Sequence, residues 1–213
     1  MSTAYLTSAY LAPVWYYTKL LGFDKIMVEG FDSYMKQSYR NRCRVAEADG
    51  VLSLTIPTEK PDCPKCLMRD VRISDHGHWR RVHWNALEAA YRHSPFFEYY
   101  ADDFAPFYER QYTFLWDFNM ELCRLVCDLI DLHPDMEATE DYRKDVPNDY
   151  RELIHPKNDY RTDTTFQPVP YYQVFDEKQG FLPNLSIVDL LFNMGPESLI
   201  VLQRSIASPP ANI

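Results

Sequence analysis

Glycine is scarce in this chain of 213 residues, which has 6 glycines against 15 prolines. No two of the glycines, at positions 22, 30, 50, 77, 180 and 195, lie within seven residues of each other. Phosphate-binding loops, dinucleotide-binding fingerprints and nucleophile elbows all need closely spaced glycines, because backbone amides must approach a phosphate or a strained turn must form. The sequence therefore excludes these three motifs.

Long apolar runs and excess positive charge are also lacking. The apolar stretch at 9–17 is interrupted by Pro13 and is shorter than the ~20 residues that span a bilayer. Acidic residues outnumber basic ones by 31 to 22, which disfavours attraction to nucleic acid or to an anionic membrane. We expect no membrane span and no nucleic-acid partner. Five unevenly spaced cysteines without an export signal predict a cytoplasmic protein with free thiols.

Hydropathy patterns predict both strands and helices. Alternating or β-type composition predicts strands at 4–11, 25–29 and 51–56, and another around Val71 and Ile73. Helical periodicity and capping signals predict helices at 13–22, from 79, from Ser94 and Pro95, at 110–132, at 186–194 and onward to about 206. In the 186–194 helix, we expect Ser186 as the N-cap and Asp189 as its capping-box partner.

The order of these elements predicts an α/β or α+β fold. A small mixed sheet from the N-terminal half would pack against three to five helices. We expect a single domain over 1–213, with a polar excursion at 136–167 and a flexible tail at 207–213. The excursion has three copies of Asp-Tyr-Arg, which are too closely spaced to be units of a repeat fold.

The densest functional signal is a basic stretch in an otherwise acidic protein. Lys36, Arg40, Arg42 and Arg44 lie within nine residues and would project from one face of an extended chain. Like charges in this arrangement repel unless carboxylates or a bound anion face them. Two interpretations stay open, namely pairing with internal acids and an anion-binding site.

Histidine and cysteine residues suggest further chemistry. His83 lies close to the apolar stripe of its helix and is either a packed core residue or a general base. Cys43 could act as a nucleophile with His83 as its base, or be a buried small hydrophobe. Cys63 and Cys66 have the spacing of zinc ligands, but a single such pair is weak evidence, so we expect no metal.

Several segments resemble the WbqC-like protein family, in its branch widespread in Bacteroidetes. The resemblance extends over nearly the whole chain and rests on the order of these segments: 36–42, 54–57, 83–84, 90–91, 94–100, 154–157 and 184–195. Many relatives begin with a segment like Gln-Pro-His-Tyr-Leu-Pro-Trp, whereas Ser8–Trp15 of this chain has neither the Gln nor the His. The family takes its name from a gene cluster for surface polysaccharide (O-antigen) synthesis. The resemblance implies acyl or aminoacyl transfer onto an amino sugar.

We therefore expect a transferase that acts on a phosphate-bearing metabolite such as a nucleotide-linked amino sugar, without a cofactor. Lys36, Arg40 and Arg42 would bind the anionic portion, His83 would be the general base, and Asn41 and Asn119 would orient the substrate. This hypothesis requires the cations and His83 to surround one hollow. The alternative is a non-catalytic binding or scaffold protein whose basic strip docks an acidic partner.

Overall fold

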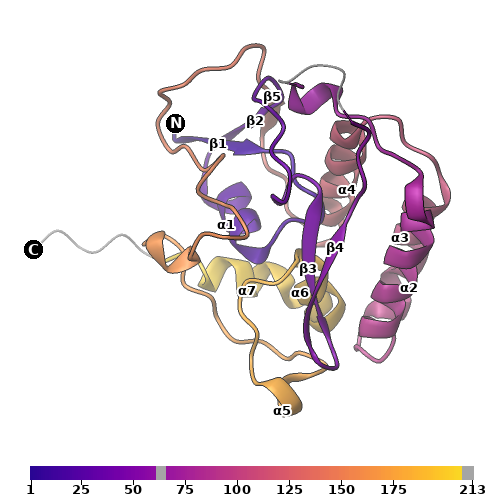
Figure 1. Cartoon of the computed structure of the whole chain (residues 1–213). Coiled ribbons are helices and arrows are strands. Elements are labelled where there is room, and N and C mark those ends of the chain that lie inside the picture. The colour runs from indigo at the N-terminus through magenta and orange to yellow at the C-terminus, as the bar shows by residue number, and fades with distance from the viewer. Residues whose placement is uncertain (61–65, 208–213) are drawn as a thin grey trace, which may run out of the picture.

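The fold contains a parallel sheet of three strands (Figure 1). The computed structural model describes residues 1–60 and 66–207. The sheet has the strand order β1 (Thr3–Thr7), β2 (Lys25–Glu29) and β5 (Met136–Ala138). Thr7 pairs with Glu29 in register, and Val28 pairs with Ala138. The three strands therefore end at one edge of the sheet, which we call the carboxyl edge.

An antiparallel hairpin of β3 (Arg42–Glu47) and β4 (Gly50–Thr55) forms a second, separate sheet. Its side chains alternate as the pleat requires. Cys43 and Val45 are buried on one face, and Arg42 and Arg44 lie on the other. This alternation shows why a stretch of basic residues can also be a strand with an apolar face.

Helices surround the two sheets. In Figure 1, α2 (Trp79–Tyr91) and α3 (Phe97–Glu109) lie side by side at one end of the molecule, and α2 also contacts β3. Helix α6 (Ile187–Met194) is buried along nearly its whole length, and Phe192 within it packs edge-on against Phe97 and Phe104. The remaining helices are α1 (Val14–Gly22), α4 (Leu115–Leu129), α5 (Asp176–Gln179) and α7 (Ser198–Arg204), with short 3₁₀ turns at Met68–Asp70, His76–His78, Tyr160–Thr162 and Gly195–Glu197.

The predicted α/β class is confirmed, with two differences in the strands. The third strand of the parallel sheet, β5, belongs to the polar segment 136–167 and not to the N-terminal half. Three residues are too few for a detectable alternation, so pattern reasoning missed it. Val71 and Ile73 are buried but lie in no regular strand, because the bridges at Arg72 and Ile73 are isolated.

Helix ends also differ from the prediction. Helix α3 begins at Phe97, because the Ser94 hydroxyl donates to the carbonyl of Tyr91 at the end of α2. Ser186 does cap α6, and it accepts a hydrogen bond from the backbone N–H of Val188. Asp189 is not its capping-box partner, because its carboxylate binds other side chains and the N–H of Ser186 donates to Arg44.

Two further predictions concern the chain as a whole. Within residues 1–60 and 66–207, no helix has the length and apolar character needed to cross a bilayer. Residues 208–213 of the predicted tail lie outside the described residues. The tail prediction and the single-domain prediction stay predictions.

Candidate functional site

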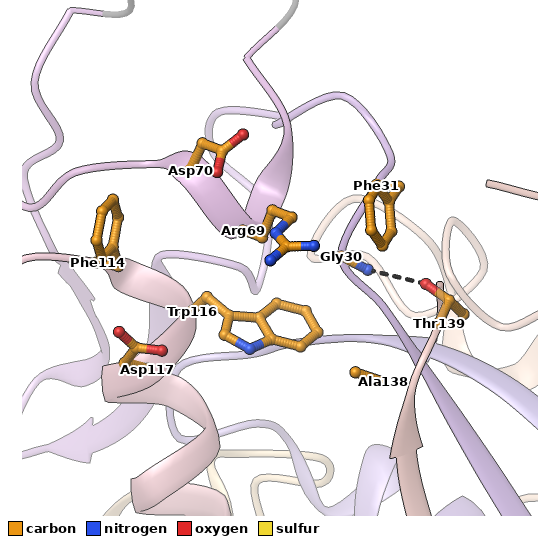
Figure 2. Close-up of a pocket in the computed structure, with 9 residues that line it drawn as sticks. All are labelled: Gly30, Phe31, Arg69, Asp70, Phe114, Trp116, Asp117, Ala138 and Thr139. Atoms are coloured by element: carbon orange, nitrogen blue, oxygen red, sulfur yellow. Dashed lines mark hydrogen bonds between the residues drawn. The ribbon is translucent and has the colours of Figure 1, made fainter. Parts of the chain in front are cut away.

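A pocket of about 420 Å³ opens at the carboxyl edge of the parallel sheet (Figure 2). Open parallel sheets usually bind ligands outside the carboxyl ends of their strands, so the location is favourable. Two lining residues follow β2 directly, two come from the end of β5, two from the 3₁₀ turn before Val71, and three from the start of α4 and the residue before it. These are Gly30, Phe31, Ala138, Thr139, Arg69, Asp70, Phe114, Trp116 and Asp117.

Gly30 allows the walls of this pocket to come together. A Cβ atom at this position would lie 3.3 Å from the indole of Trp116 and 3.6 Å from Cβ of Arg69. The N–H of Arg69 donates to the carbonyl of Gly30 at 3.0 Å. Cζ of Arg69 then lies 4.9 Å from the centroid of the Phe31 ring, and in Figure 2 the guanidinium lies between Phe31 and Trp116. The pocket therefore presents a cation beside two aromatic surfaces.

These groups can contact several parts of a ligand. A guanidinium pairs well with phosphate, and aromatic faces stack on sugar rings or bases. The carboxylates of Asp70 and Asp117 lie on the Phe114 side of the pocket, away from Thr139 (Figure 2). They can accept hydrogen bonds from hydroxyl or amino groups. A second hollow of about 480 Å³ lies between α3 and α4, but Arg110 there is already paired with Glu121.

Glu29 is a buried residue that holds two of the residues lining the pocket. Its Oε1 accepts hydrogen bonds of 2.8 Å from both the hydroxyl of Thr139 and the N–H of Phe31. Its Oε2 accepts from Arg151 at 2.9 Å. Arg151 is the arginine of the middle Asp-Tyr-Arg segment, and the carboxylate of Asp149 raises its pKa. This ion pair joins the polar segment to the carboxyl edge.

Arg40 lies in the interior and is already neutralised. It is 1% exposed, and its Nη2 contacts Asp32 and, at 2.9 Å, Glu152. Burial opposes its charge, but the two carboxylates raise its pKa overall. Burial raises the pKa of Asp32, while Arg40 opposes this shift. Internal pairing is therefore the interpretation that holds for Arg40.

Two of the other residues predicted to bind the substrate lie next to Arg40. The amide nitrogen of Asn119 donates to the carbonyl of Arg40 at 2.7 Å. The amide nitrogen of Asn41 donates to Ile56 at 2.9 Å. Lys36, by contrast, is exposed, and Arg42 donates to the hydroxyl of Thr55 on the outward face of the hairpin. The structure brings Arg40, Asn41 and Asn119 together.

His83 lies deep in the core, 3% exposed. Its Nδ1 is 2.9 Å from the hydroxyl of Tyr10. Burial lowers its pKa to about 4, against a smaller opposing effect from the backbone of Thr55, so the ring is neutral at pH 7. Burial also raises the pKa of Cys43, which contacts Tyr10, so this residue is a thiol at pH 7 and not a thiolate.

The arrangement does not favour a hollow shared by His83 and Arg42. Cys43 contacts Tyr10, which also contacts His83, and its neighbour Arg42 points to the opposite face of the hairpin because strand side chains alternate. A catalytic role for His83 stays a prediction that the arrangement does not favour. Cys63 lies outside the described residues, so the zinc hypothesis is not tested.

Comparison with known proteins shows the family of this chain. The model of the WbqC-like protein family matches residues 8–157. The chain belongs to this family. It is also 28% identical over 209 residues to the uncharacterized protein Rv1507c of Mycobacterium tuberculosis (strain ATCC 25618 / H37Rv), a similarity that covers 85% of this chain and 89% of the relative. No solved structure matches the chain.

The family match contains the carboxyl edge and the departure noted in the sequence. Ser8 and Tyr10 belong to the segment Ser8–Trp15, which lacks the Gln and His of the family motif, and they follow β1. The hydroxyl of Ser8 is 3.5 Å from the amide nitrogen of Asn119, and Tyr10 contacts His83. The start of this segment therefore lies in the polar interior, where Asn119 also contacts Arg40.

Sequence reasoning missed Arg69, Trp116, Glu29 and Arg151. One signal was available, because a charged residue and a glycine follow directly after the apolar residues of β2, at Glu29 and Gly30. A glycine at the end of a strand is typical of a close approach by another group. Arg69 and Trp116 had no comparable signal, since their positions depend on how two distant segments pack.

Proposed function

We propose that this WbqC-like protein binds a phosphate-bearing sugar, such as a nucleotide-linked amino sugar, in the pocket at the carboxyl edge. We propose further that it transfers an acyl or aminoacyl group to the amine of that sugar, in surface polysaccharide biosynthesis. The observation that supports binding is the position of Arg69 between the ring of Phe31, which follows β2, and the indole of Trp116, at the start of α4. The choice of reaction rests on the family alone.

The pocket residues have suitable roles in such a reaction. Arg69 would pair with the phosphate, and Phe31 and Trp116 would pack against the ring of the sugar or base. The neutral amine nitrogen would attack the acyl carbonyl carbon and lose a proton. The bond between that carbon and the leaving group of the donor would then break. A carboxylate near the amine would accept the proton, because a carboxylate within hydrogen-bond reach can act as a general base.

We also propose a cytoplasmic location. Cys43, Cys123 and Cys127 are buried and free. Free thiols of this kind persist most readily in a reducing compartment. Nucleotide-linked sugars would be available to the enzyme there.

The alternative of a scaffold protein with a basic strip has less support from the geometry. Arg40 is buried and paired, so it cannot contribute to an exposed strip. Lys36, Arg42 and Arg44 remain, and the hydroxyl of Thr55 already engages Arg42. An enzyme or small-molecule binding protein is therefore the better interpretation.

Calorimetric titration with UDP-glucosamine tests the proposed binding. Removal of a charged hydrogen bond costs about 1.5–3 kcal/mol, so Arg69→Ala should weaken binding about tenfold or more. Arg42→Ala is the matched control, because it removes an arginine outside the pocket. Unchanged affinity in Arg69→Ala, or a larger loss in Arg42→Ala, would overturn the assignment of the pocket.

A further inference from the structure

Buried polar atoms without hydrogen-bond partners gather near the carboxyl edge. In residues 1–60 and 66–207 they include Oγ1 of Thr7, Oδ1 of Asp32, Nε of Arg40 and Oδ1 of Asn119. Each of these four residues is more than nine-tenths buried. Native proteins satisfy the large majority of buried polar atoms, so a group of exceptions in one place needs an explanation.

The residues that hold these atoms are connected to one another. Thr7 lies beside Glu29 in the sheet register. Burial is the main cause of the raised pKa of Asp32, and the charge of Glu29 raises it further. The two carboxylates are therefore near each other. Asp32 pairs with Arg40.

The connection then returns to the end of β1. The carbonyl of Arg40 accepts from Asn119, and Asn119 approaches the hydroxyl of Ser8, which follows Thr7 in the chain. The contacts therefore form a closed loop that begins and ends at the end of β1. We call this set the Arg40 ring, and its members are Thr7, Ser8, Glu29, Asp32, Arg40 and Asn119.

The unused hydrogen-bonding capacity of the ring is mainly that of acceptors. Oδ1 of Asp32 and Oδ1 of Asn119 can only accept, and the hydroxyl oxygen of Thr7 can also accept. Nε of Arg40 is the one atom of these four that can only donate. A ligand that complements the ring must therefore supply more donors than acceptors.

The charge around the ring favours a cation. Two guanidinium groups, those of Arg40 and Arg151, pair with four carboxylates, which belong to Glu29, Asp32, Asp149 and Glu152. In the described part of the chain, no group of three or more His, Cys, Asp or Glu side chains has an arrangement that could hold a metal ion. A primary ammonium group has one positive charge and three donors, and it meets both requirements.

We propose that the Arg40 ring binds the primary ammonium group of an amine substrate. The proposal rests on the proposed function and deepens it, since it assigns the amine of the sugar to a location. Phe31 and Thr139 line the pocket and both donate to Glu29 of the ring, so a sugar in the pocket lies beside the ring. The bound ammonium would transfer one proton to Oδ1 of Asp32, which has no other partner, before its nitrogen attacks.

Thermal unfolding of the full chain with methylammonium chloride tests the ring directly. Methylammonium should raise the melting temperature above its value in sodium chloride or tetramethylammonium chloride of equal ionic strength. Thr7→Val should reduce the apparent affinity for methylammonium about tenfold. This variant removes a hydroxyl without a partner, so the fold should be retained. Thr55→Val, on the outward face of the hairpin, is the matched control.

Two results would overturn the proposal. If methylammonium and sodium have the same effect, water alone satisfies the ring atoms. If Thr7→Val responds to methylammonium as the unmodified protein does, the ammonium binds elsewhere. Asp32→Asn gives a second, stronger test, since it removes the negative charge and should abolish the response.

Sugar phosphates separate this proposal from the proposed function. Glucosamine 1-phosphate should bind more tightly than glucose 1-phosphate, and Thr7→Val should remove that preference without weakening glucose 1-phosphate. Arg69→Ala should weaken both compounds. If neither binds while the methylammonium response persists and depends on Thr7, the proposed function fails and the ammonium site stands. If both bind and the amine gives no preference, the ammonium site fails.

Discussion

The three Asp-Tyr-Arg segments allow the effect of burial on an ion pair to be measured in one protein. In each segment the arginine pairs with the aspartate two residues earlier. Arg143 and Arg161 are 68% and 77% exposed, whereas Arg151 is 3% exposed and also pairs with Glu29, which is fully buried. The local sequence and the pair with aspartate are alike, so the three arginines differ mainly in burial and in the second pair that Arg151 makes with Glu29.

Substitution of each arginine by methionine should therefore give unequal losses of stability. Arg151→Met leaves the charge of Glu29 buried without its partner, a change that costs about 3–5 kcal/mol. Arg143→Met and Arg161→Met remove exposed ion pairs, which contribute about 0–1 kcal/mol. Urea unfolding followed by circular dichroism measures all three. Equal losses would refute the conclusion that Arg151 is an internal anchor of the carboxyl edge.

A double substitution separates the loss of an ion pair from the loss of packing. Glu29→Gln removes the buried negative charge that Arg151→Met leaves without a partner. The double variant should be more stable than the sum of the two single losses implies, by about 1 kcal/mol or more. If the two losses simply add, the pair does not interact in the way that the 2.9 Å contact implies.

Three further substitutions have expected outcomes. Gly30→Ala places a methyl group 3.3 Å from Trp116, so it should cost about 1 kcal/mol and weaken UDP-glucosamine binding in calorimetry; unchanged affinity would contradict ligand placement beside Trp116. His83 has a folded pKa of about 4, below 6.5, so the protein should lose about 3 kcal/mol relative to His83→Gln as the pH falls from 6.5 to 4. Burial raises the pKa of Asp189 from 3.8 to about 6, so the protein should lose about 3 kcal/mol relative to Asp189→Asn as the pH rises from 4 to 6. Urea unfolding between pH 4 and 7 checks both, and parallel pH profiles for variant and unmodified protein would contradict them.

Much of the fold could be predicted where a pattern is long or buried on one face. The strand at 25–29 and the helix from Trp79 appear where periodicity places them. Strand β5 could not be predicted, because its three residues gain their pairing from β2 and not from their own alternation. The predicted start of α3 was wrong because the Ser94 hydroxyl can either accept from a backbone N–H as an N-cap or donate to a carbonyl of the preceding helix, and only the packed structure decides between them.

The candidate site was less predictable, because residues that contact each other there lie far apart in the sequence. The stretch around Arg40 indicates charge, but the partner Glu152 lies 112 residues further along the chain. No local pattern reveals such a partner. The same stretch therefore fits an anion site and an internal ion pair equally well. Asn119 was singled out with Arg40, and the structure does place it at the carbonyl of that residue.

Two buried aspartates show why satisfaction of hydrogen bonds, and not burial alone, distinguishes a binding group from a structural one. Asp189 accepts hydrogen bonds from Tyr91, Tyr171 and Gln173, so both of its oxygens have partners within the protein. Asp32 has one oxygen on Arg40 and one without a partner. A buried charge that the protein satisfies completely contributes to the fold, whereas one left half-satisfied lowers stability unless something else binds it. Substitution of Asp189 should therefore change stability and leave ligand binding alone, and substitution of Asp32 should change the response to amines.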